Sequence, residues 1–292
     1  GVYHGTLRPT RSGTAAAPIT FRALERRTAQ LVGEYGSAYA LQLSHVEHIH
    51  IEGLHIKPMS TQGRWLLVDG SKHIRITDAL MEDASGSMPF LINNSEQVQV
   101  RDSVIRRYVG HNMARVSHSK WVLFEGNAIS RTGHSPLQFY PVGSNQYVVV
   151  RDNVFHPAWG RAFEFFATQD LLFEGNIVTN SYDGGRSASS NAKILSRRGI
   201  FRFNRVFRNW GGPISASPGT EWQFRGIRLY HNVFDGNLEY GLSGSVSAAN
   251  VGDVKYVNNV FSRNDVHGNH CQVQFTGTGS PEANPQGELE PR

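Results

Sequence analysis

The sequence has little of what marks the commonest classes of protein. Its single cysteine, Cys271, forms no disulfide within the chain and is expected to be a small core residue. It has no apolar run of the roughly 18 residues that a membrane-spanning helix needs. No repeat spaces apolar residues three and four apart over about ten residues, which excludes a helical solenoid. Basic tails and nucleic-acid-binding motifs are also lacking. We therefore expect neither a membrane span nor a nucleic-acid partner.

The balance of charge nevertheless favours an anionic partner. Lysine and arginine outnumber aspartate and glutamate by 29 to 24, for a net charge of +5. A basic cleft raises the local concentration of anionic ligands. Because the cations are scattered rather than gathered in a tail, an acidic polysaccharide or oligosaccharide is the favoured partner, bound by a monomer.

One phrase of eight residues recurs along the chain. In its clearest form, residues 148–155, two apolar residues alternate with other residues, a turn follows, and Asn153 precedes apolar Phe155. The positions equivalent to Asn153 are Leu54, Ala79, Ser103, Asn127, Asn153, Asn176, Arg205, Asn232 and Asn259, at intervals of 23 to 29 residues. In the degenerate copy near Ile200, Asn204 is the alternative to Arg205. Such a period indicates one small unit stacked many times.

The unit is predicted to consist of short strands. Alternating apolar residues are typical of strands, and a variable turn and a second short apolar run follow each phrase. Strands that pair in register with the next copy form an all-β solenoid, a single-stranded right-handed parallel β-helix of about ten coils. Asparagines at one corner of successive coils are expected to form a buried ladder of amides. We predict one β-helix domain over residues 1–275 and a polar, Pro/Gly-rich tail over residues 276–292.

The chain begins within a coil, at residues 1–23. Because the end of a solenoid needs a polar cap, we expect further residues, with a signal sequence among them, before residue 1.

Three N-terminal segments carry a family resemblance: residues 1–5, 17–23 and 48–56. They resemble the opening coils of secreted pectate-lyase-like β-helix proteins, and are most similar to the alginate and chondroitin lyases of polysaccharide lyase family 6. The resemblance implies carbohydrate chemistry outside the cell or in the periplasm. The chain departs from that family in lacking the Lys-Ser-Glu segment that supplies its catalytic lysine and calcium-binding carboxylate. It also lacks the Asp-Pro-His-Asp signature of alginate epimerases and the paired aspartates of polygalacturonases.

Residues at equivalent positions of a β-helix form rows along its axis, and two rows carry charge. Two residues before the asparagine position, Arg101, Glu125, Arg151 and Glu174 alternate in sign, which predicts a solvated ion-pair ladder with a structural role.

The second row begins at the turn before the later strand, and its His and Arg residues have no matching row of acids. Its turn residues are Arg64, His111, His134, Arg161 and Arg186, and strand parity predicts that Met113, Arg115, Pro136, Gln138, Tyr140, Glu164 and Lys193 point outward. Like charges stacked one coil apart repel, so the row is a poor ion-pair ladder. It predicts an anion-binding groove, and surface turns of a basic protein are the alternative.

A groove of this composition suits β-elimination at a uronate residue, which needs a base, a proton donor and a neutralised carboxylate. We expect Arg115 or Arg161, with Gln138, to hold the carboxylate. His134 or His111 is the candidate base, and Tyr140 the acid. The catalytic set is thus His134, His111, Arg115 and Tyr140, and the substrate-binding set is Arg161, Gln138, Glu164, Lys193, Arg64 and Arg186.

Other interpretations stay open. A glycoside hydrolase would pair Glu164 with a second carboxylate such as Asp183, and a non-catalytic carbohydrate-binding or adhesin-like solenoid needs neither. A further row, His48, His73, Gln97, Trp121 and Tyr147, offers aromatic rings for sugar stacking, although packing is the commoner reason for such a row. No cofactor is expected, and the alternative is calcium bound by the loop acids Glu82, Asp83 and Asp183.

Overall fold

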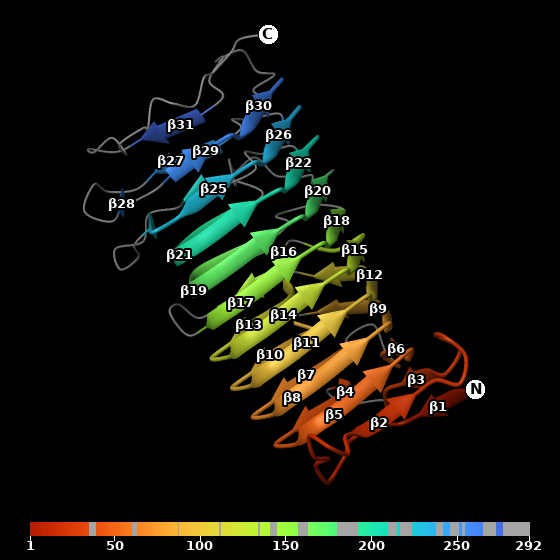
Figure 1. Ribbon diagram of the computed structural model, residues 1–292. Helices are drawn as coiled ribbons and strands as arrows, with labels where there is room; N and C mark the ends of the chain where they lie inside the picture. Colours follow the sequence, from red (N-terminus) through yellow and green to blue (C-terminus); the bar gives the residue numbers. More distant parts are fainter. Residues whose placement is uncertain are drawn as a thin grey trace.

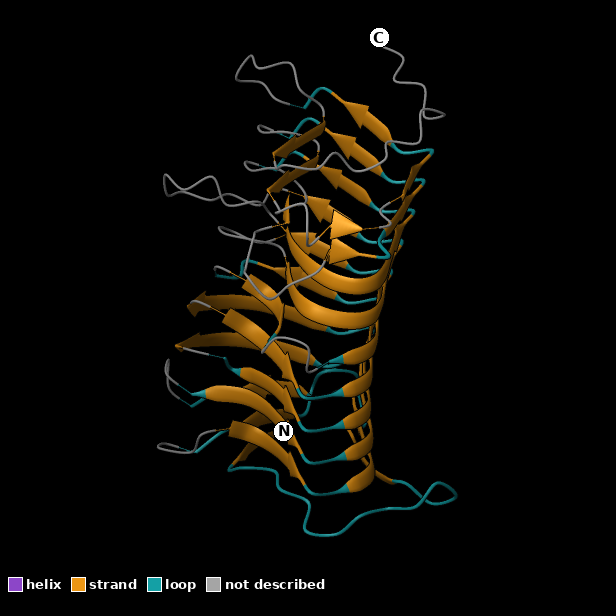
Figure 2. Ribbon diagram, turned by 90° about the vertical axis from the view of Figure 1, so that its left-hand side faces the viewer, coloured by secondary structure: helices purple, strands orange, loops and turns teal. Residues whose placement is uncertain are grey.

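The computed structural model describes residues 1–34, 39–59, 63–86, 88–110, 112–133, 135–140, 145–156, 163–179, 192–209, 215–216, 224–237, 242–245, 251–252, 255–264 and 273–276. Every regular element within these ranges is a β-strand, and the strands stack coil upon coil along one axis (Figures 1 and 2). No helix in the described part of the chain is long and apolar enough to cross a membrane.

Each coil contributes strands to three faces of the solenoid, which we number 1, 2 and 3 in the order in which the chain passes through them. Face 3 is a sheet of eleven short strands: β1 (Val2–His4), β3 (Gln30–Val32), β6 (His55–Lys57), β9 (Leu80–Gly86), β12 (Val104–Gly110), β15 (Ala128–Ser130), β18 (Val154–His156), β20 (Ile177–Thr179), β22 (Arg205–Phe207), β26 (Val233–Asp235) and β30 (Val260–Ser262). All of these strands pair in parallel with the next, as the repeat predicted.

The remaining twenty strands form a second sheet that comprises faces 1 and 2. Face 1 consists of β4 (Tyr39–Ser44), β7 (Arg64–Asp69), β10 (Phe90–Asn93), β13 (Asn112–Ser117), β16 (Ser135–Phe139), the first halves of β19 (Phe163–Glu174) and β21 (Ala192–Arg202), β23 (Ser215–Ala216), β27 (Leu242–Ser245) and β31 (Val273–Thr276). Face 2 consists of β2 (Ile19–Arg22), β5 (Glu47–Glu52), β8 (Lys72–Thr77), β11 (Glu96–Arg101), β14 (Lys120–Glu125), β17 (Gln146–Arg151), the second halves of β19 and β21, β24 (Phe224–Arg225), β25 (Arg228–Tyr230), β28 (Val251–Gly252) and β29 (Lys255–Val257).

The right-handed parallel β-helix is therefore confirmed. The eleven strands of face 3 are close to the number of coils that the spacing of the repeat predicts.

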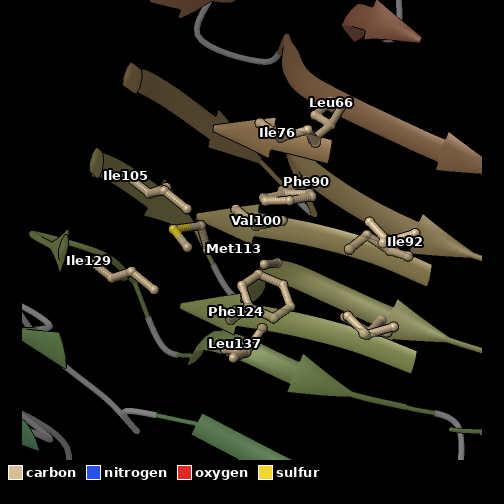
Figure 3. Close-up of a cluster of buried hydrophobic side chains, with 14 of the residues drawn as sticks. Leu66, Ile76, Phe90, Ile92, Val100, Ile105, Met113, Phe124, Ile129 and Leu137 are labelled. Carbon is tan, nitrogen blue, oxygen red and sulfur yellow. The ribbon is translucent and has the colours of Figure 1, made fainter. Parts of the chain in front are cut away.

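The core runs as rows of apolar side chains along the axis. Leu66, Phe90, Ala114 and Leu137 pair in register on face 1 and are all buried. Figure 3 shows Phe90 and Leu137 pointing inward toward Phe124 of face 2 and Ile129 of face 3. Each coil thus buries apolar area against its own other strands and against both neighbouring coils, which is the main stabilising term.

Strand parity gave two wrong predictions at the start of face 1. Met113 and Pro136 were expected to point outward, but both are buried. Alternation between inside and outside begins only at Ala114 and Leu137. The residue before each lies at the corner of the coil, where the chain turns inward, as Trp65 also does in an earlier coil.

The predicted asparagine ladder is confirmed, with one change of position. In each step, one amide oxygen accepts two bonds from the preceding coil: Asn153 Oδ1 accepts from the backbone N and the Nδ2 of Asn127, both at 2.9 Å. The ladder continues through Asn176 to Asn204 rather than Arg205. Asn204 is buried and bonded to the next coil, whereas Arg205 is exposed at the start of β22. Only the amide offers both a donor and an acceptor at this corner.

Two further ladders, at the other corners of the coil, were not predicted from the sequence. Asn209, Asn237 and Asn264 repeat the amide arrangement after face 3. Between faces 1 and 2, Ser71, Ser95 and Ser119 bond in turn to the next coil, and Asn145 accepts the last of these bonds. Each corner thereby satisfies its buried backbone N–H groups.

The ion-pair ladder is also confirmed. Glu125 accepts from Arg101 at 2.8 Å on one side and from Arg151 at 2.6 Å on the other, and Arg202 reaches Glu174 at 2.9 Å. These pairs are partly exposed, and pairs of that kind contribute about 0.2–1 kcal/mol each.

We expect Asn153→Ala to lower the free energy of unfolding by about 1–3 kcal/mol, because the two buried donors of Asn127 lose their acceptor. Denaturant unfolding monitored by circular dichroism measures the change. Val154→Ala, at the next and outward-facing residue, is the control and is expected to change stability by no more than about 0.5 kcal/mol. Equal stability of the two variants would show that the amide bonds of the ladder do not contribute to the free energy of unfolding.

Candidate functional site

Equivalent positions of the face 1 strands form one row along the axis. The register runs from Gln42 through Leu67, Leu91, Arg115, Gln138 and Glu164 to Lys193. Four of the predicted site residues, Arg115, Gln138, Glu164 and Lys193, thus occupy the same row on consecutive coils, about 4.8 Å apart. This placement agrees with the sequence prediction.

Three of the predicted side chains meet on this row. Arg115 Nε donates to Gln138 Oε1 at 3.1 Å. The guanidinium carbon of Arg115 also lies 5.1 Å from the centre of the Tyr140 ring, within range of a cation–π contact. Tyr140 is tied to the previous coil because its backbone N donates to Val116 O. The outcome is a fixed guanidinium between an amide and a phenol.

The exposure of the three groups differs. Tyr140 is 40% exposed and Arg115 is half-buried, while Gln138 is only 7% exposed. Tyr140 and Arg115 are therefore partly exposed to solvent, and Gln138 is buried. We call these three residues the Arg115 cluster.

Arg64 is placed away from that cluster. It begins β7, two coils before Arg115, and its Nη1 donates to the Tyr39 hydroxyl at 2.9 Å. Its guanidinium carbon lies 5.3 Å from the centre of the Tyr39 ring. Arg64 thus does not extend the cluster, because its side chain packs on Tyr39 of the preceding coil.

The other predicted residues lie partly or wholly outside the described residues. These are His111, His134, Arg161 and Arg186, together with Asp183 of the alternative hydrolase pair. For Glu164 and Lys193 the structure describes the strand position, in register with Gln138. His111 and His134 directly precede β13 and β16, the two strands that carry Arg115 and Gln138.

A row on face 2 contains the aromatic residues for which sugar stacking was the alternative to packing. We call it the bulge row: His48, His73, Gln97, Trp121, Tyr147, Asp170, Arg198 and Gly226. Each member is skipped by the register of its strand pair and has a positive φ, from 52° to 55° in the seven that carry a side chain. A left-handed residue that bulges from the strand without changing its register therefore projects one side chain from each coil.

The rings in the bulge row stack on one another along the axis. His48 and His73 lie 4.3 Å apart and 5° from parallel, and Trp121 and Tyr147 lie 5.5 Å apart and 9° from parallel. Each ring thus covers a flat face of its partner, and the row positions on either side of the second pair are occupied by Gln97 and Asp170. Because a sugar stacks on an open flat face, the geometry favours the packing interpretation of this row.

A cluster of charged side chains on face 3 was not recognised as a unit from the sequence. Glu82, with 6% of its side chain exposed, lies 2.8 Å from both Arg106 Nε and Arg107 Nη2, and 3.0 Å from His55 Nε2. Asp83 accepts from Arg107 at 2.6 Å and lies 2.9 Å from Lys57 Nζ. We call this set the Glu82 network.

The Glu82 network has shifted pKa values. Burial alone would raise the pKa of Glu82, but the hydrogen bond from Arg106 and the charges of Arg107 and His55 outweigh burial and hold it below its usual value. The hydrogen bond from Arg107 likewise lowers the pKa of Asp83. Burial lowers the pKa of His55, and the charge of Glu82 opposes that shift.

The two acids of the network were the alternative calcium ligands. Their oxygens are engaged by Arg106, Arg107 and Lys57 instead. Across the described ranges, no group of three or more His, Cys, Asp or Glu side chains is arranged to hold a metal ion.

Comparison with known proteins agrees with the architecture. The model of the family described as "Right handed beta helix region" matches residues 39–198. No functionally curated protein matches the chain in sequence.

Several solved structures share the fold. One is an alginate lyase from Paenibacillus sp. str. FPU-7, with 15% identity, a TM-score of 0.63, and 96% of this chain and 89% of that chain covered. Another is an endo-xylogalacturonan hydrolase from Aspergillus tubingensis, with 9% identity, a TM-score of 0.61 and the same two coverages. A third is the A-module of a mannuronan C-5 epimerase from Azotobacter vinelandii, with 11% identity, a TM-score of 0.55, and coverages of 96% and 91%. Identities this low show a common fold.

Proposed function

Since the chain belongs to the family of right-handed β-helix regions, we propose that it cleaves an acidic, uronate-containing polysaccharide by β-elimination along face 1. The observation that carries the proposal is the Arg115 cluster, in which Arg115, Gln138 and Tyr140 come together on consecutive coils. The named substrates of the similar structures, alginate, xylogalacturonan and mannuronan, support a polysaccharide as the ligand.

β-Elimination would use these groups as follows. A base removes the proton from the carbon next to the uronate carboxylate. The electron pair of that C–H bond forms a carbon–carbon double bond, and the bond to the glycosidic oxygen breaks. Negative charge develops on the carboxylate in the transition state, and the guanidinium of Arg115 would neutralise it.

The proton steps need two further groups. Tyr140 is 40% exposed and its ring lies beside Arg115, and its hydroxyl would donate a proton to the departing oxygen. His134 or His111, which precede the strands of the cluster, would act as the base. A polymer of this kind is an extracellular substrate, so the proposal includes a secreted or periplasmic protein that works as a monomer.

The test is a panel of four polymers: alginate, pectate, hyaluronan and chondroitin. Ultraviolet absorbance of the unsaturated uronic end and the number of new reducing ends are followed in the same samples. We expect both to rise together with at least one polymer. Reducing ends without the absorbance would contradict elimination and favour hydrolysis by Glu164 and Asp183. Binding without cleavage would favour a non-catalytic solenoid.

A further inference from the structure

Three histidines lie together on face 2, on the neighbouring strands β5 and β8 near the N-terminal end of the solenoid (Figure 1). His48 and His73 are the stacked pair of the bulge row. His50 follows two residues after His48, and Arg75 pairs with it in the register of the two strands. We call these four residues the histidine patch.

The polar atoms of the histidine patch have no partner within the chain. Across the described residues, no hydrogen bond engages a ring nitrogen of the three histidines, and no carboxylate lies within ion-pair distance of Arg75. His73 and Arg75 are exposed, and His48 and His50 are half-buried. Stacking uses the flat faces of His48 and His73 and leaves their nitrogens unused. The patch therefore offers donors and one positive charge to a ligand.

The fixed charges around the patch come from β2, β5, β8, β11 and the loop before β2: Arg11, Arg22, Glu47, Glu52, Lys72, Glu96 and Arg101. Glu52 and Glu96 are each paired with a cation, at 2.5 and 3.8 Å, and Arg101 belongs to the ion-pair ladder. The remaining acid is Glu47, and the remaining cation is Arg11, in the loop that the backbone N of Glu47 binds. These surrounding charges therefore balance one another, and the arginine of the patch is left in excess.

Protonation of the histidines adds to that excess. An imidazole ordinarily titrates near about pH 6.5, so a fall in pH brings further positive charge to the patch. The rings of His48 and His73 are 4.3 Å apart and repel each other when both are charged. Burial and the charge of Arg75 lower the pKa of His50, although Glu52 opposes them. A bound anion would offset this repulsion, so anion binding and proton uptake strengthen each other.

The coils that follow the patch carry groups that suit a saccharide. Gln97 and Gln99 of β11 continue the two rows of the patch, and Gln97 is exposed. On the next coil, β14 adds Trp121, which is 47% exposed, and the half-buried Leu123. Amides bond hydroxyl groups, and apolar side chains contact the C–H face of a sugar ring. This surface favours an anionic saccharide over a bare ion.

We propose that the histidine patch binds the carboxylate or sulfate groups of an acidic saccharide lying along face 2, and that it does so under mildly acidic conditions. Arg75 holds one such group through its planar fork, and the ring N–H groups of His48 and His73 donate to it. The inference rests on the proposed function only for the class of ligand. The patch lies on a different face from the Arg115 cluster and holds the saccharide without cleaving it.

Two substitutions test the patch without touching face 1. His73→Gln removes one titrating ring and keeps the backbone, because Gln97 occupies this row on the next coil with φ of 54°, against 53° at His73. Arg75→Gln removes the permanent charge and introduces the residue that the next coil carries in register, Gln99. The matched control is His231→Gln, directly after β25. His231 is also exposed, has φ of 52° and stacks on an aromatic neighbour.

The measurement is calorimetric titration at about pH 5.5 and about pH 7.5, on either side of the ordinary imidazole pKa. An Arg115→Ala background prevents cleavage from consuming the probe. The probes are tetragalacturonate, which carries only carboxylates, sulfated cellotetraose, which carries only sulfates, and neutral cellotetraose. We expect at least one anionic probe to bind about tenfold more tightly at the lower pH, which identifies the preferred group.

The two variants should change this binding in different ways. Arg75→Gln should weaken it by about 5–10-fold at both pH values, because the guanidinium is always charged. His73→Gln should weaken it by about 5–10-fold at the lower pH and by less than about twofold at the higher pH. The His231→Gln control should match the parent at both. Melting temperatures verify that each variant folds.

Three results would overturn the inference: no binding of either anionic probe, equal binding of cellotetraose, or the same gain of affinity on acidification in His73→Gln as in the parent. Failure of the proposed function is a separate outcome, because it is measured by cleavage on face 1. Acid-dependent binding without cleavage of any polymer would leave the histidine patch standing and remove the lyase. Cleavage with binding that neither variant alters would do the reverse.

Discussion

Glu82→Gln is expected to lower the free energy of unfolding by about 2–4 kcal/mol, since it leaves the cations of the Glu82 network without their shared carboxylate. Arg106 and Arg107 both lie 2.8 Å from Glu82 Oε2, whereas the side chain of Glu82 is almost fully buried. The loss should be below that of a fully buried pair, because the two arginines are partly exposed to water. Chemical denaturation at pH 7 measures the change.

Glu96→Gln is the matched control for this prediction. Glu96 lies on the neighbouring face, with 40% of its side chain exposed, and its partner Lys72 is 3.8 Å away. Removing such a surface pair normally changes stability by less than about 1 kcal/mol. Equal losses of unfolding free energy in the two variants would show that the burial of Glu82 does not increase the contribution of the network to stability.

The pH dependence of the same variant provides a second measurement. The pKa values of Glu82 and Asp83 lie below their ordinary values in the folded protein. Their contribution to stability is therefore complete above about pH 5, and is lost as the pH falls from the unfolded pKa toward the folded one. We expect the parent protein to lose stability on acidification, and Glu82→Gln to lose less over the same range.

The fold was readable from the sequence because two signals coincide in most of the repeats. Alternation with a period of two defines the strands, and a small polar residue at a fixed offset defines the corner, as in Val148, Val150 and Asn153. The single error of position, Arg205 for Asn204, arose because spacing alone cannot separate neighbouring residues. The structure separates them by chemistry, since only Asn204 bonds the coils on both sides.

Side-chain direction was less predictable wherever the backbone departs from a regular strand. Met113 sits at a corner, where two consecutive residues turn inward. In the bulge row the sequence identifies Trp121 and Tyr147 as neighbours, but not the positive φ that each adopts or the way their rings face each other. The period of the sequence gives the position of a residue along the coil. A residue with positive φ changes the direction of its side chain without changing that position.

The Glu82 network was missed although its signal is present in the sequence. Lys57, Glu82 and Arg106 stand one repeat apart on the same row of face 3, with opposite charges on adjacent coils. The same alternation of charge that identifies the ladder of face 2 is thus present on face 3. What spacing could not show is that Arg107, at a residue with positive φ, bends back to join Asp83 to the same cluster.

Arg115→Ala is expected to reduce kcat on the polymer that the parent cleaves by about 10²–10³-fold, the usual effect of removing one group that stabilises developing negative charge. Arg115 is the half-buried guanidinium that the structure holds between Gln138 and Tyr140. Initial rates of ultraviolet absorbance at saturating polymer separate kcat from binding. Tyr140→Phe, which removes the proposed proton donor and keeps the ring, should cost about 10²–10⁴-fold.

Arg101→Ala is the control for loss of one positive charge. Arg101 belongs to the ion-pair ladder of face 2, and Glu125 keeps its other partner, Arg151, when Arg101 is removed. Its kcat should match that of the parent. Arg115→Lys keeps the charge but not the planar fork that holds a carboxylate through two bonds, so it should fall between the parent and Arg115→Ala. An unchanged kcat in Arg115→Ala would show that the reaction does not take place at the Arg115 cluster. Neither the amide of Gln138 nor the phenol of Tyr140 can replace the positive charge that the guanidinium supplies.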